Sequence, residues 1–260
     1  MDQVALELYT VREQAAADFP GTLRAVAEAG YRAVEFAGTH GLATGELRAT
    51  LDGLGLRAMG AHIALDRFLE DAGQAIAEAK ELGCAYAVVP WLAPERRGSG
   101  AATRELAGTL NRIGERCRAE GIALAYHNHE FEFDPLPDED GKTMLDLLVE
   151  GTDPALVGFE LDIGWVVVAG HDPLALMARL KGRVPLLHLK DLAPGSDGAD
   201  APVGEGTIDW APILAAPSTA GVNWYVVEQD KPADALADVA TSLRNLERLA
   251  DGVRTGFDAC

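Results

Sequence analysis

Short apolar runs of strand length alternate along the chain with longer amphipathic runs. Eight apolar runs have the length of buried strands. They cover residues 4–10, 33–38, 57–63, 85–91, 122–129, 157–163, 185–191 and 224–230. Between them, apolar residues recur at helical spacing in segments that end at glycine, a residue that commonly terminates helices. These segments cover residues 22–30, 44–55, 70–83, 103–121, 173–182 and 233–252.

Strands that alternate with helices predict parallel β–α–β units. Eight such units predict the α/β class and, within it, a closed (β/α)8 TIM barrel rather than an open sheet. No G-x-G-x-x-G motif follows the first strand, which counts against a dinucleotide-binding fold. The chain has 260 residues, an ordinary length for one barrel, and no linker rich in proline, glycine or serine divides it. We therefore expect a single domain over residues 1–260.

The amino-acid composition indicates which kinds of molecule the protein binds and where in the cell it is found. The formal net charge is −19 and the sequence pI is about 4.6. An acidic surface repels nucleic acid and anionic lipid, so we expect a small-molecule ligand and neither a nucleic acid nor a membrane partner. The cysteines Cys84, Cys117 and Cys260 have no paired spacing, which is typical of a reducing compartment. With no signal peptide and no membrane-spanning run in the sequence, the expected location is the cytoplasm.

Residues that could take part in catalysis or metal binding lie where the predicted strands end. In a barrel of this type the active site lies at the carboxyl ends of the strands. Polar residues occupy these ends in five of the eight predicted strands. They are His62, His127, His129, Glu130, Glu160, Asp162, His188, Lys190 and Glu228. Such residues from different strands are expected to converge on one rim.

Strand alternation decides which of these residues share a face, because side chains at i and i+2 point the same way. The pairs are His127 with His129, Glu160 with Asp162, and His188 with Lys190. Carboxylates inside a barrel are costly unless a cation compensates them. A mixed imidazole and carboxylate set suits Mn²⁺, Co²⁺, Zn²⁺ or Fe²⁺ better than Mg²⁺. The alternative is a structural salt-bridge network that involves Lys190.

Several motifs resemble the xylose-isomerase-like sugar isomerase/epimerase superfamily, a group of metal-dependent (β/α)8 barrels. The resemblance runs nearly end to end and is greatest to the inosose dehydratase-like branch and to enzymes that act on 3-keto sugars or glycosides. The matching segments are "LELYTVR" (6–12), "YRAVEFAG" (31–38), "AHIALD" (61–66), "AYHNHEFEF" (125–133), "VGFELDIGWVVVAGHDP" (157–173), "LLHLKD" (186–191), "VGEGTIDW" (203–210) and "VVEQD" (226–230).

The resemblance implies a divalent metal held by Asp162, His188 and Glu228 on strands six to eight. Strand five departs from the family pattern, because "LAYHNH" places His127 where relatives have glutamate. The fourth ligand is therefore His127, His129 on the same face, or Glu160. Trp165 stands where several relatives have histidine, which counts against a multi-metal cluster of the endonuclease IV type.

The reaction that the resemblance implies is metal-assisted proton transfer next to the carbonyl of a keto sugar or polyol derivative, through an enediolate. Glu228 would be both ligand and acid/base group, with His127 or His129 as its partner and Glu160 in reserve. A histidine in place of a glutamate base suits departure of a β-hydroxyl or a glycosyl group. A dehydratase or lyase is therefore the alternative. Lys190 is either a donor to a substrate oxygen or an ion-pair partner of Glu160 or Asp191.

Further residues are candidates for contact with the substrate. Aromatic rings of Trp91, Trp165 and Trp210 suit stacking on sugars, although Trp210 equally suits the start of a helix. Glu205 in the "VGEG" loop either contacts the substrate or is solvated. The substrate-binding set is His62, Trp91, Glu130, Trp165 and Glu205.

Two other classes compete with this interpretation. A DNA-repair nuclease on the same barrel is disfavoured by the charge of −19 and by the lack of a basic stripe. A non-catalytic sugar-binding barrel is consistent with the altered strand five, but Asp162, His188 and Glu228 argue for catalysis. The resemblance also implies homo-oligomers, since dimers and tetramers are frequent in the superfamily.

Overall fold

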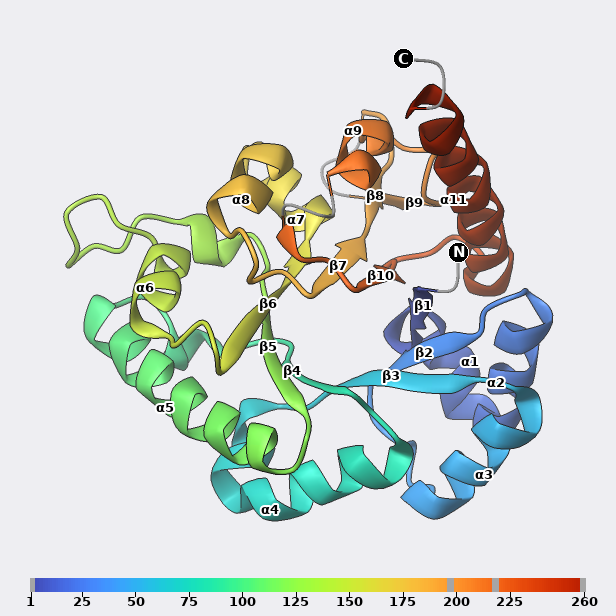
Figure 1. Cartoon of the computed structure of the whole chain (residues 1–260), viewed down its shortest axis with the longest axis horizontal. Coiled ribbons are helices and arrows are strands. Elements are labelled where there is room, and N and C mark those ends of the chain that lie inside the picture. The colour runs from blue at the N-terminus through green and yellow to red at the C-terminus, as the bar shows by residue number, and fades with distance from the viewer. Residues whose placement is uncertain (1–2, 196–198, 217–219, 258–260) are drawn as a thin grey trace.

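The computed structural model describes residues 3–195, 199–216 and 220–257. Eight parallel strands form a closed barrel, with helices outside the ring of strands (Figure 1). The strands are β1 (Val4–Glu7), β2 (Ala33–Phe36), β3 (Arg57–His62), β4 (Tyr86–Val89), β5 (Ala123–His127), β6 (Val157–Asp162), β7 (Leu186–Leu189) and β10 (Trp224–Val227). Pairing of β1 with β10 closes the ring, so the predicted (β/α)8 barrel is confirmed.

The helices of the described chain follow the strands in sequence. They are α1 (Arg12–Ala17), α2 (Phe19–Glu28), α3 (Thr44–Leu54), α4 (Leu65–Leu82), α5 (Gly100–Ala119), α6 (Met144–Gly151), α7 (Ile163–Val168), α8 (Pro173–Arg179), α9 (Trp210–Ala215) and α11 (Ala235–Phe257). Short 3-10 helices cover Leu8–Val11, Pro94–Arg96 and Phe131–Phe133. A two-stranded antiparallel pair, β8 (Asp191–Leu192) and β9 (Asp200–Ala201), follows β7.

Local sequence explains where several elements begin and end. Helices α3 and α4 end at Gly55 and Gly83, whose left-handed backbone is the usual helix stop. Helix α6 was not anticipated, although Thr143 and Asp146 form a capping box at its start. Helix α7 was also missed. It follows β6 without a loop, so its apolar sequence "IGWVVV" resembles a continued strand.

All eight barrel strands are shorter than the sequence indicated, and two of them show why. The first ends at Glu7 rather than residue 10, because residues 8–11 turn into a 3-10 helix. The fifth ends at His127 rather than at residue 129. Directly after it, the Asn128 side chain bonds the backbone of Asp162 on β6, which replaces ladder pairing by a side-chain contact.

The barrel interior is layered. A small apolar layer on the amino-terminal side consists of Ala5, Ala33, Met59, Val88, Ala125, Leu186 and Val226. Two residues further along their strands lie Glu7, Glu35, His127, His188 and Glu228, all buried. Since side chains alternate along a strand, both sets point into the barrel. The larger apolar core lies outside it, between the strands and the helices.

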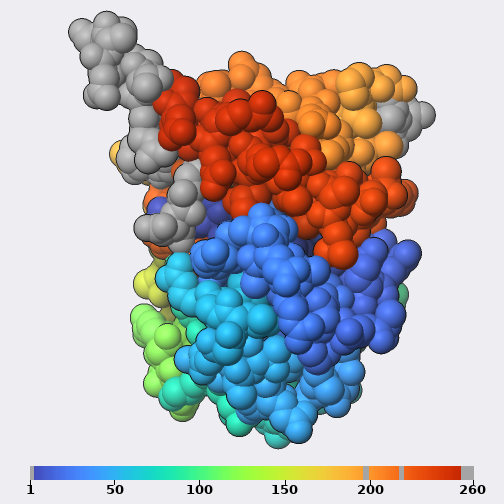
Figure 2. All heavy atoms as spheres, turned by 90° about the vertical axis from the view of Figure 1, so that its right-hand side faces the viewer, coloured from blue at the N-terminus to red at the C-terminus, as the bar shows by residue number. Residues whose placement is uncertain are grey.

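The last helix packs against the first part of the chain. Figure 2 shows the carboxyl-terminal segment lying directly on the amino-terminal elements. Inside this contact the hydroxyl of buried Tyr31 donates a 2.9 Å hydrogen bond to the backbone oxygen of Val239 on α11. The contact joins the two ends of the barrel sequence, which supports closure of the sheet.

Other expectations concern single residues and boundaries. Cys84 and Cys117 are buried free thiols, and Cys260 lies outside the described residues. Each helix in the described ranges is too short or too polar to cross a membrane. The assignment of residues 1–260 to one domain stays a prediction.

A close helix contact gives a test of the packing. A Cβ on Gly114 of α5 would lie 2.6 Å from the backbone oxygen of Leu156, whereas one on Gly108 of the same helix would meet nothing nearer than 3.6 Å. We expect Gly114→Ala to lower the free energy of unfolding by about 1–3 kcal/mol. The matched Gly108→Ala should raise it by about 0.5–1 kcal/mol, because alanine favours helix. Urea denaturation measures the free energy of unfolding of both variants. Equal changes in the two variants would contradict the close contact at Gly114.

Candidate metal centre

Imidazole and carboxylate groups fill the carboxyl-terminal half of the barrel interior. Two overlapping sets of four residues each place one ligand atom per residue within 4.8 Å of the others. The first set is His127, Asp162, His188 and Glu228, all buried. The second set is His62, His127, Glu160 and His188. His127 on β5 and His188 on β7 belong to both, so two candidate cation positions share these two imidazoles.

His188 connects strands on opposite sides of the ring. Its Nδ1 lies 2.9 Å from Oε2 of Glu228, which directly follows β10. Its Nε2 lies 3.0 Å from Oε2 of Glu35 on β2 and 3.1 Å from Oε2 of Glu160 on β6. One fully buried ring therefore contacts three carboxylates.

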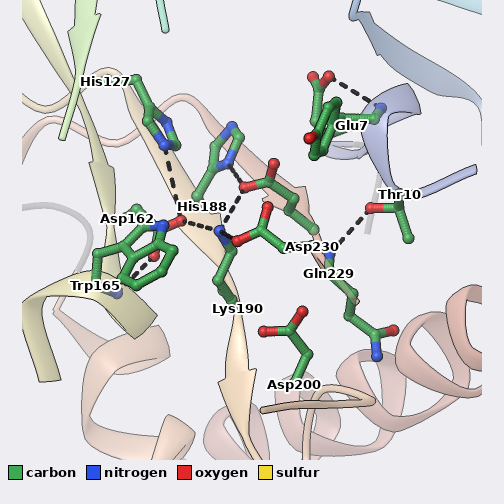
Figure 3. Close-up of polar contacts among 12 residues, drawn as sticks. Glu7, Thr10, His127, Asp162, Trp165, His188, Lys190, Asp200, Gln229 and Asp230 are labelled. Carbon is green, nitrogen blue, oxygen red and sulfur yellow. Dashed lines mark hydrogen bonds and ion pairs between the residues drawn. The ribbon is translucent and has the colours of Figure 1, made fainter. Parts of the chain in front are cut away.

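Glu160 is the second centre of contacts. Its Oε2 lies 2.8 Å from His62 Nε2 and 3.0 Å from His127 Nδ1, besides its contact with His188. The second ring nitrogen of His127, Nε2, is directed toward Asp162 and lies 3.9 Å from Oδ2 of that residue (Figure 3). His127 thus lies between the two carboxylates of β6, as the strand alternation of Glu160 and Asp162 requires.

Mutual attraction sets the charges of this group. Burial favours the neutral forms of Glu160 and Glu228, yet the neighbouring cations hold the pKa of both carboxyls well below the usual range. Burial also opposes protonation of the histidines. The surrounding carboxylates nevertheless raise the pKa of His62 to about 10 and that of His188 well above its ordinary value. Protons on His62 and His188 therefore compensate ionised acids.

The two histidines of the "YHNH" segment differ from these. Burial lowers the pKa of His127 to about 4. Burial, together with the nearby His127, lowers the pKa of His129 to about 2. Both rings are neutral at neutral pH and retain a lone pair, which is the form that binds a metal. His127 belongs to both candidate sets of ligands, whereas His129 belongs to neither. The ring centroids of the two residues are nevertheless only 4.9 Å apart.

Asp162 is held in place by its local fold. Its Oδ1 accepts a 2.9 Å hydrogen bond from the backbone N–H of Trp165 and thereby caps α7. Its own backbone N–H donates a 3.0 Å hydrogen bond to Oδ1 of Asn128. These contacts leave Oδ2 buried and directed at the cluster, where it accepts no hydrogen bond among the described residues and has the Lys190 ammonium 3.2 Å away.

Lys190 forms the cationic edge of the group. Its Nζ lies 2.8 Å from Asp230 Oδ2 and 3.2 Å from both Asp162 Oδ2 and Glu228 Oε2 (Figure 3). The ammonium also lies 4.8 Å from the centroid of the Trp165 ring. The sequence predicted that Lys190 would pair with Glu160 or Asp191. In the structure it pairs instead with Asp230, Asp162 and Glu228. The salt-bridge interpretation and the metal interpretation of the sequence therefore involve the same atoms.

Two further buried carboxylates, those of Glu7 and Glu35, lie next to the cluster. Glu7 and Glu35 are completely buried, and with His62 they form a third set of ligand atoms within 4.8 Å. Burial raises the pKa of both groups. The sequence signal was a lone glutamate inside each of two apolar strands, "VALE" and "AVEF". Sequence reasoning gave neither residue a role.

The first set fits a divalent cation. It offers two neutral-capable imidazoles and two carboxylates, the donors that first-row divalent metals prefer. All four ligand atoms lie within 4.8 Å, and the buried Asp162 Oδ2 accepts no hydrogen bond within the described residues. Its close partner is the Lys190 ammonium at 3.2 Å, so this oxygen already stabilises one positive charge and suits a cation.

Aromatic rings line the mouth above the cluster. His129 stacks on Phe131 with ring centroids 5.6 Å apart and tilts against Trp165 at the same distance. His129 Nδ1 and Trp165 Nε1 are buried without hydrogen-bond partners among the described residues. Trp91, at the end of β4, is 48% exposed. The mouth therefore combines apolar ring faces with free polar atoms, as sugar ligands require.

The remaining predicted contacts lie further out. Glu130 and Glu205 are exposed, and the side chain of neither contacts the cluster within the described residues. His62 lies within the cluster rather than at the mouth. Trp210 starts α9, is buried, and donates from Nε1 to Asp191 Oδ2 at 2.8 Å, which excludes it from sugar stacking in this conformation. The roles assigned to His62, Trp91, Glu130, Trp165 and Glu205 stay predictions.

Asp191 organises the loop that carries Glu205. Its carboxylate accepts hydrogen bonds from the backbone N–H groups of Gly204, Gly206 and Ile208 at 2.8–3.1 Å. A Cβ on Gly206 would lie 2.1 Å from Asp191 Oδ1, so this approach requires glycine. The "VGEGTIDW" segment is thus fixed beside the barrel by one side chain of strand β8.

A closed barrel with this cluster at its carboxyl end defines a xylose-isomerase-like protein. The family model described as the xylose isomerase-like TIM barrel matches residues 23–249. The chain therefore belongs to this family, as its motifs indicated.

Among curated proteins, the chain is similar to the inosose dehydratase of Lacticaseibacillus casei, with 32% identity over 148 residues. This match covers 50% of the chain and 48% of the relative, so the chain spans about half the length of the curated relatives it matches. A solved sugar phosphate isomerase/epimerase from Parabacteroides distasonis is 25% identical with a TM-score of 0.80, covering 96% of this chain and 94% of that one. The IolI protein with a bound zinc atom has a TM-score of 0.75 at 14% identity, covering 96% and 99%. That last likeness shows the shared fold.

A buried acid beside the mouth gives a pH test. Glu132 Oε1 accepts a 2.6 Å hydrogen bond from the Tyr126 hydroxyl, and Oε2 accepts one of 2.8 Å from the His129 backbone N–H. Burial raises the pKa of Glu132 to about 8. The unfolded chain therefore loses this proton first, so the group reduces stability as pH rises from about 4.5 to about 8, by at most about 1.4 kcal/mol per unit.

We expect Glu132→Gln to flatten this decline, since the amide is neutral and donates to Tyr126 while accepting from His129. The stability difference between variant and wild type should grow in favour of the variant from pH 5 to pH 8 in urea titrations. The exposed Glu130→Gln is the control and should follow the wild-type profile. A constant difference across this range would show that Glu132 is ionised in the folded protein.

Proposed function

We propose that the protein is a divalent-metal-dependent enzyme that transfers a proton at the carbon next to the carbonyl of a sugar or polyol derivative. The set of His127, Asp162, His188 and Glu228 carries the proposal, because four buried ligand atoms converge at the active end of a barrel of this family. The name of the Parabacteroides relative, a sugar phosphate isomerase/epimerase, supports the same class of reaction.

The residues of this set would hold the ion, which is Mn²⁺, Co²⁺ or Zn²⁺ in preference to Mg²⁺ because two donors are imidazoles. A bound divalent cation supplies polarisation of a carbonyl oxygen, which acidifies the neighbouring C–H bond. The zinc in the IolI structure supports a cation in a barrel of this fold. His188 must release its proton on binding, so affinity should increase with pH.

The protein's own side chains then handle the proton. Glu228 lies at the rim with its carboxylate held ionised, so it can act as a base. Lys190, 3.2 Å away, stabilises that anion and can donate a hydrogen bond to a substrate oxygen. His129 presents the unpartnered Nδ1 at the mouth, where it suits a substrate hydroxyl. Glu160 lies deeper, between three imidazoles, and in this role it tunes their charge.

Elimination of water is the second candidate. The inosose dehydratase of Lacticaseibacillus casei supports it, and so does His127 at the position where the family pattern has glutamate. Loss of a β-hydroxyl begins with the same proton removal and then needs an acid at the leaving oxygen. The Lys190 ammonium can give that proton, whereas His129, whose pKa is lowered to about 2, is neutral and can only position the hydroxyl by a hydrogen bond. One site can thus support both outcomes.

Removal of one ligand tests the metal. We expect Asp162→Asn to weaken Mn²⁺ or Zn²⁺ binding by at least about 100-fold, because a charged donor is lost while asparagine still caps α7. The control is Asp172→Asn, which makes the same substitution at the exposed N-cap of α8. This variant should bind the metal as tightly as the wild type does. Calorimetry and elemental analysis measure both. Wild-type protein that stays metal-free with every ion would refute the proposal.

Solvent deuterium exchange tests the chemistry. The metal-loaded protein, incubated in D₂O with inosose or a 2-ketohexose, should place deuterium next to the carbonyl, as mass spectrometry detects. Glu228→Gln should lower this rate by about 100-fold or more, whereas Asp172→Asn should not change it. Growth of an ultraviolet-absorbing unsaturated ketone identifies elimination, and exchange without it identifies isomerisation or epimerisation. Metal binding without exchange into any of these compounds would favour a binding role.

A further inference from the structure

A half-buried arginine at the mouth of the barrel lacks the partner that its charge requires. Arg97 follows the 3-10 helix Pro94–Arg96 in the segment after β4. Its guanidinium carbon lies 3.6 Å from the centroid of the Phe131 ring and 5.5 Å from that of Trp91. Within the described residues, no hydrogen bond or ion pair engages this guanidinium. The flat group is therefore held by ring faces, with its N–H edges uncommitted.

Two arginines close to Arg97 in the sequence do find carboxylates. Arg96, the preceding residue, forms an ion pair with Asp66 at 2.5 Å. Arg104, on the next helix, pairs with both oxygens of Glu139 at 2.7 Å. The chain has 41 acidic and 22 basic residues, so carboxylates are abundant. Arg97 differs from other unpaired arginines by its place: it lies half-buried against aromatic rings at the mouth of the site, where it can meet a charge that arrives from outside.

The nearest buried acid meets this need only in part: Arg97 attracts the carboxylate form of Glu132, but burial raises the pKa of Glu132 to about 8 and keeps it largely neutral at pH 7. Glu132 lies on the same 3-10 helix as Phe131, but its two oxygens already accept hydrogen bonds from Tyr126 and from the His129 backbone. The aromatic contacts place Arg97 on the side of the mouth formed by β4 and β5. A continuous series of ring contacts runs from Arg97 through Phe131 to His129 and on to His127, with distances of 3.6, 5.6 and 4.9 Å.

We propose that Arg97 is a specificity-determining residue that binds an anionic group, a carboxylate or a phosphate, at the end of the substrate remote from the reacting carbonyl. The inference rests on the proposed function, since it places the carbonyl at the cluster and the anion above it. A guanidinium presents paired N–H donors whose spacing matches two oxygens of a carboxylate or a phosphate. Stacking on Phe131 and Trp91 fixes the plane of the fork before the ligand arrives, which reduces the entropy lost on binding. The preferred substrate is thus a sugar acid or a sugar phosphate rather than a neutral sugar.

Binding of matched charged and neutral compounds tests this directly. The probes are D-glucuronate against D-glucose, and D-fructose 6-phosphate against D-fructose, titrated by calorimetry at low ionic strength into the full chain with and without Mn²⁺. Wild-type protein should bind at least one charged member about 10- to 100-fold more tightly than its neutral partner, the range expected for a charge-assisted bidentate contact. The glucuronate arm reports a carboxylate site and the fructose 6-phosphate arm a phosphate site.

Variants of Arg97 decide whether this residue is responsible. Arg97→Gln should remove the preference, and Arg97→Lys, which keeps the charge without the fork, should retain part of it. Arg96→Gln is the control, because it lowers the net charge equally at the adjacent exposed position and should keep the full preference. Circular dichroism verifies that each variant is folded.

Equal affinity of the wild type for charged and neutral probes overturns the inference, as does a preference that survives in Arg97→Gln. Loss of the preference in Arg96→Gln as well would assign it to net charge and also overturn it. The outcome is independent of turnover. Arg97-dependent binding without deuterium exchange would reject the proposed function alone, whereas exchange into neutral sugars only would reject the anion site alone.

Discussion

Burial of many ionisable groups inside a closed barrel is the constraint on which the rest of this structure depends. Five buried carboxylates, those of Glu7, Glu35, Glu160, Asp162 and Glu228, lie in the carboxyl-terminal half of the barrel interior. In a medium of low polarity, such charges persist only with close cationic partners or as neutral acids. Protonated imidazoles and Lys190 supply these partners in the structure, and a divalent cation could take over the same task. The fold is therefore organised around compensation of charge.

The layers on either side of the cluster serve this arrangement. Small apolar residues such as Ala5, Ala33 and Ala125 fill the barrel below it and exclude water from that side. Above it, the rings of His129, Phe131 and Trp165 form an aromatic wall. Exclusion of water strengthens every electrostatic contact in the site, which suits the polarisation of a carbonyl group.

Residues just outside the cluster fix its geometry. Asn128 joins the ends of β5 and β6, and Asp162 both faces the cluster and caps the helix that follows. Asp191 holds the "VGEGTIDW" loop through backbone donors. Sequence motifs flagged these segments but not their function, because a side chain that bonds backbone from another strand leaves no pattern in its own neighbourhood. The same holds for Arg97, whose role depends on the missing partner rather than on a motif.

The sequence by itself determined the (β/α)8 barrel, because eight strand-length apolar runs and the glycine stops of the helical segments between them are local signals. It also placed Asp162, His188, Lys190 and Glu228 at strand ends, since alternation along a strand is local. Only the tertiary structure decided that His127 belongs to the ligand sets and His129 does not, that Glu7 and Glu35 join the cluster, and that Lys190 pairs with Asp162, Glu228 and Asp230. These outcomes depend on distances between strands far apart in sequence. Barrel closure sets those distances, and no local pattern encodes them.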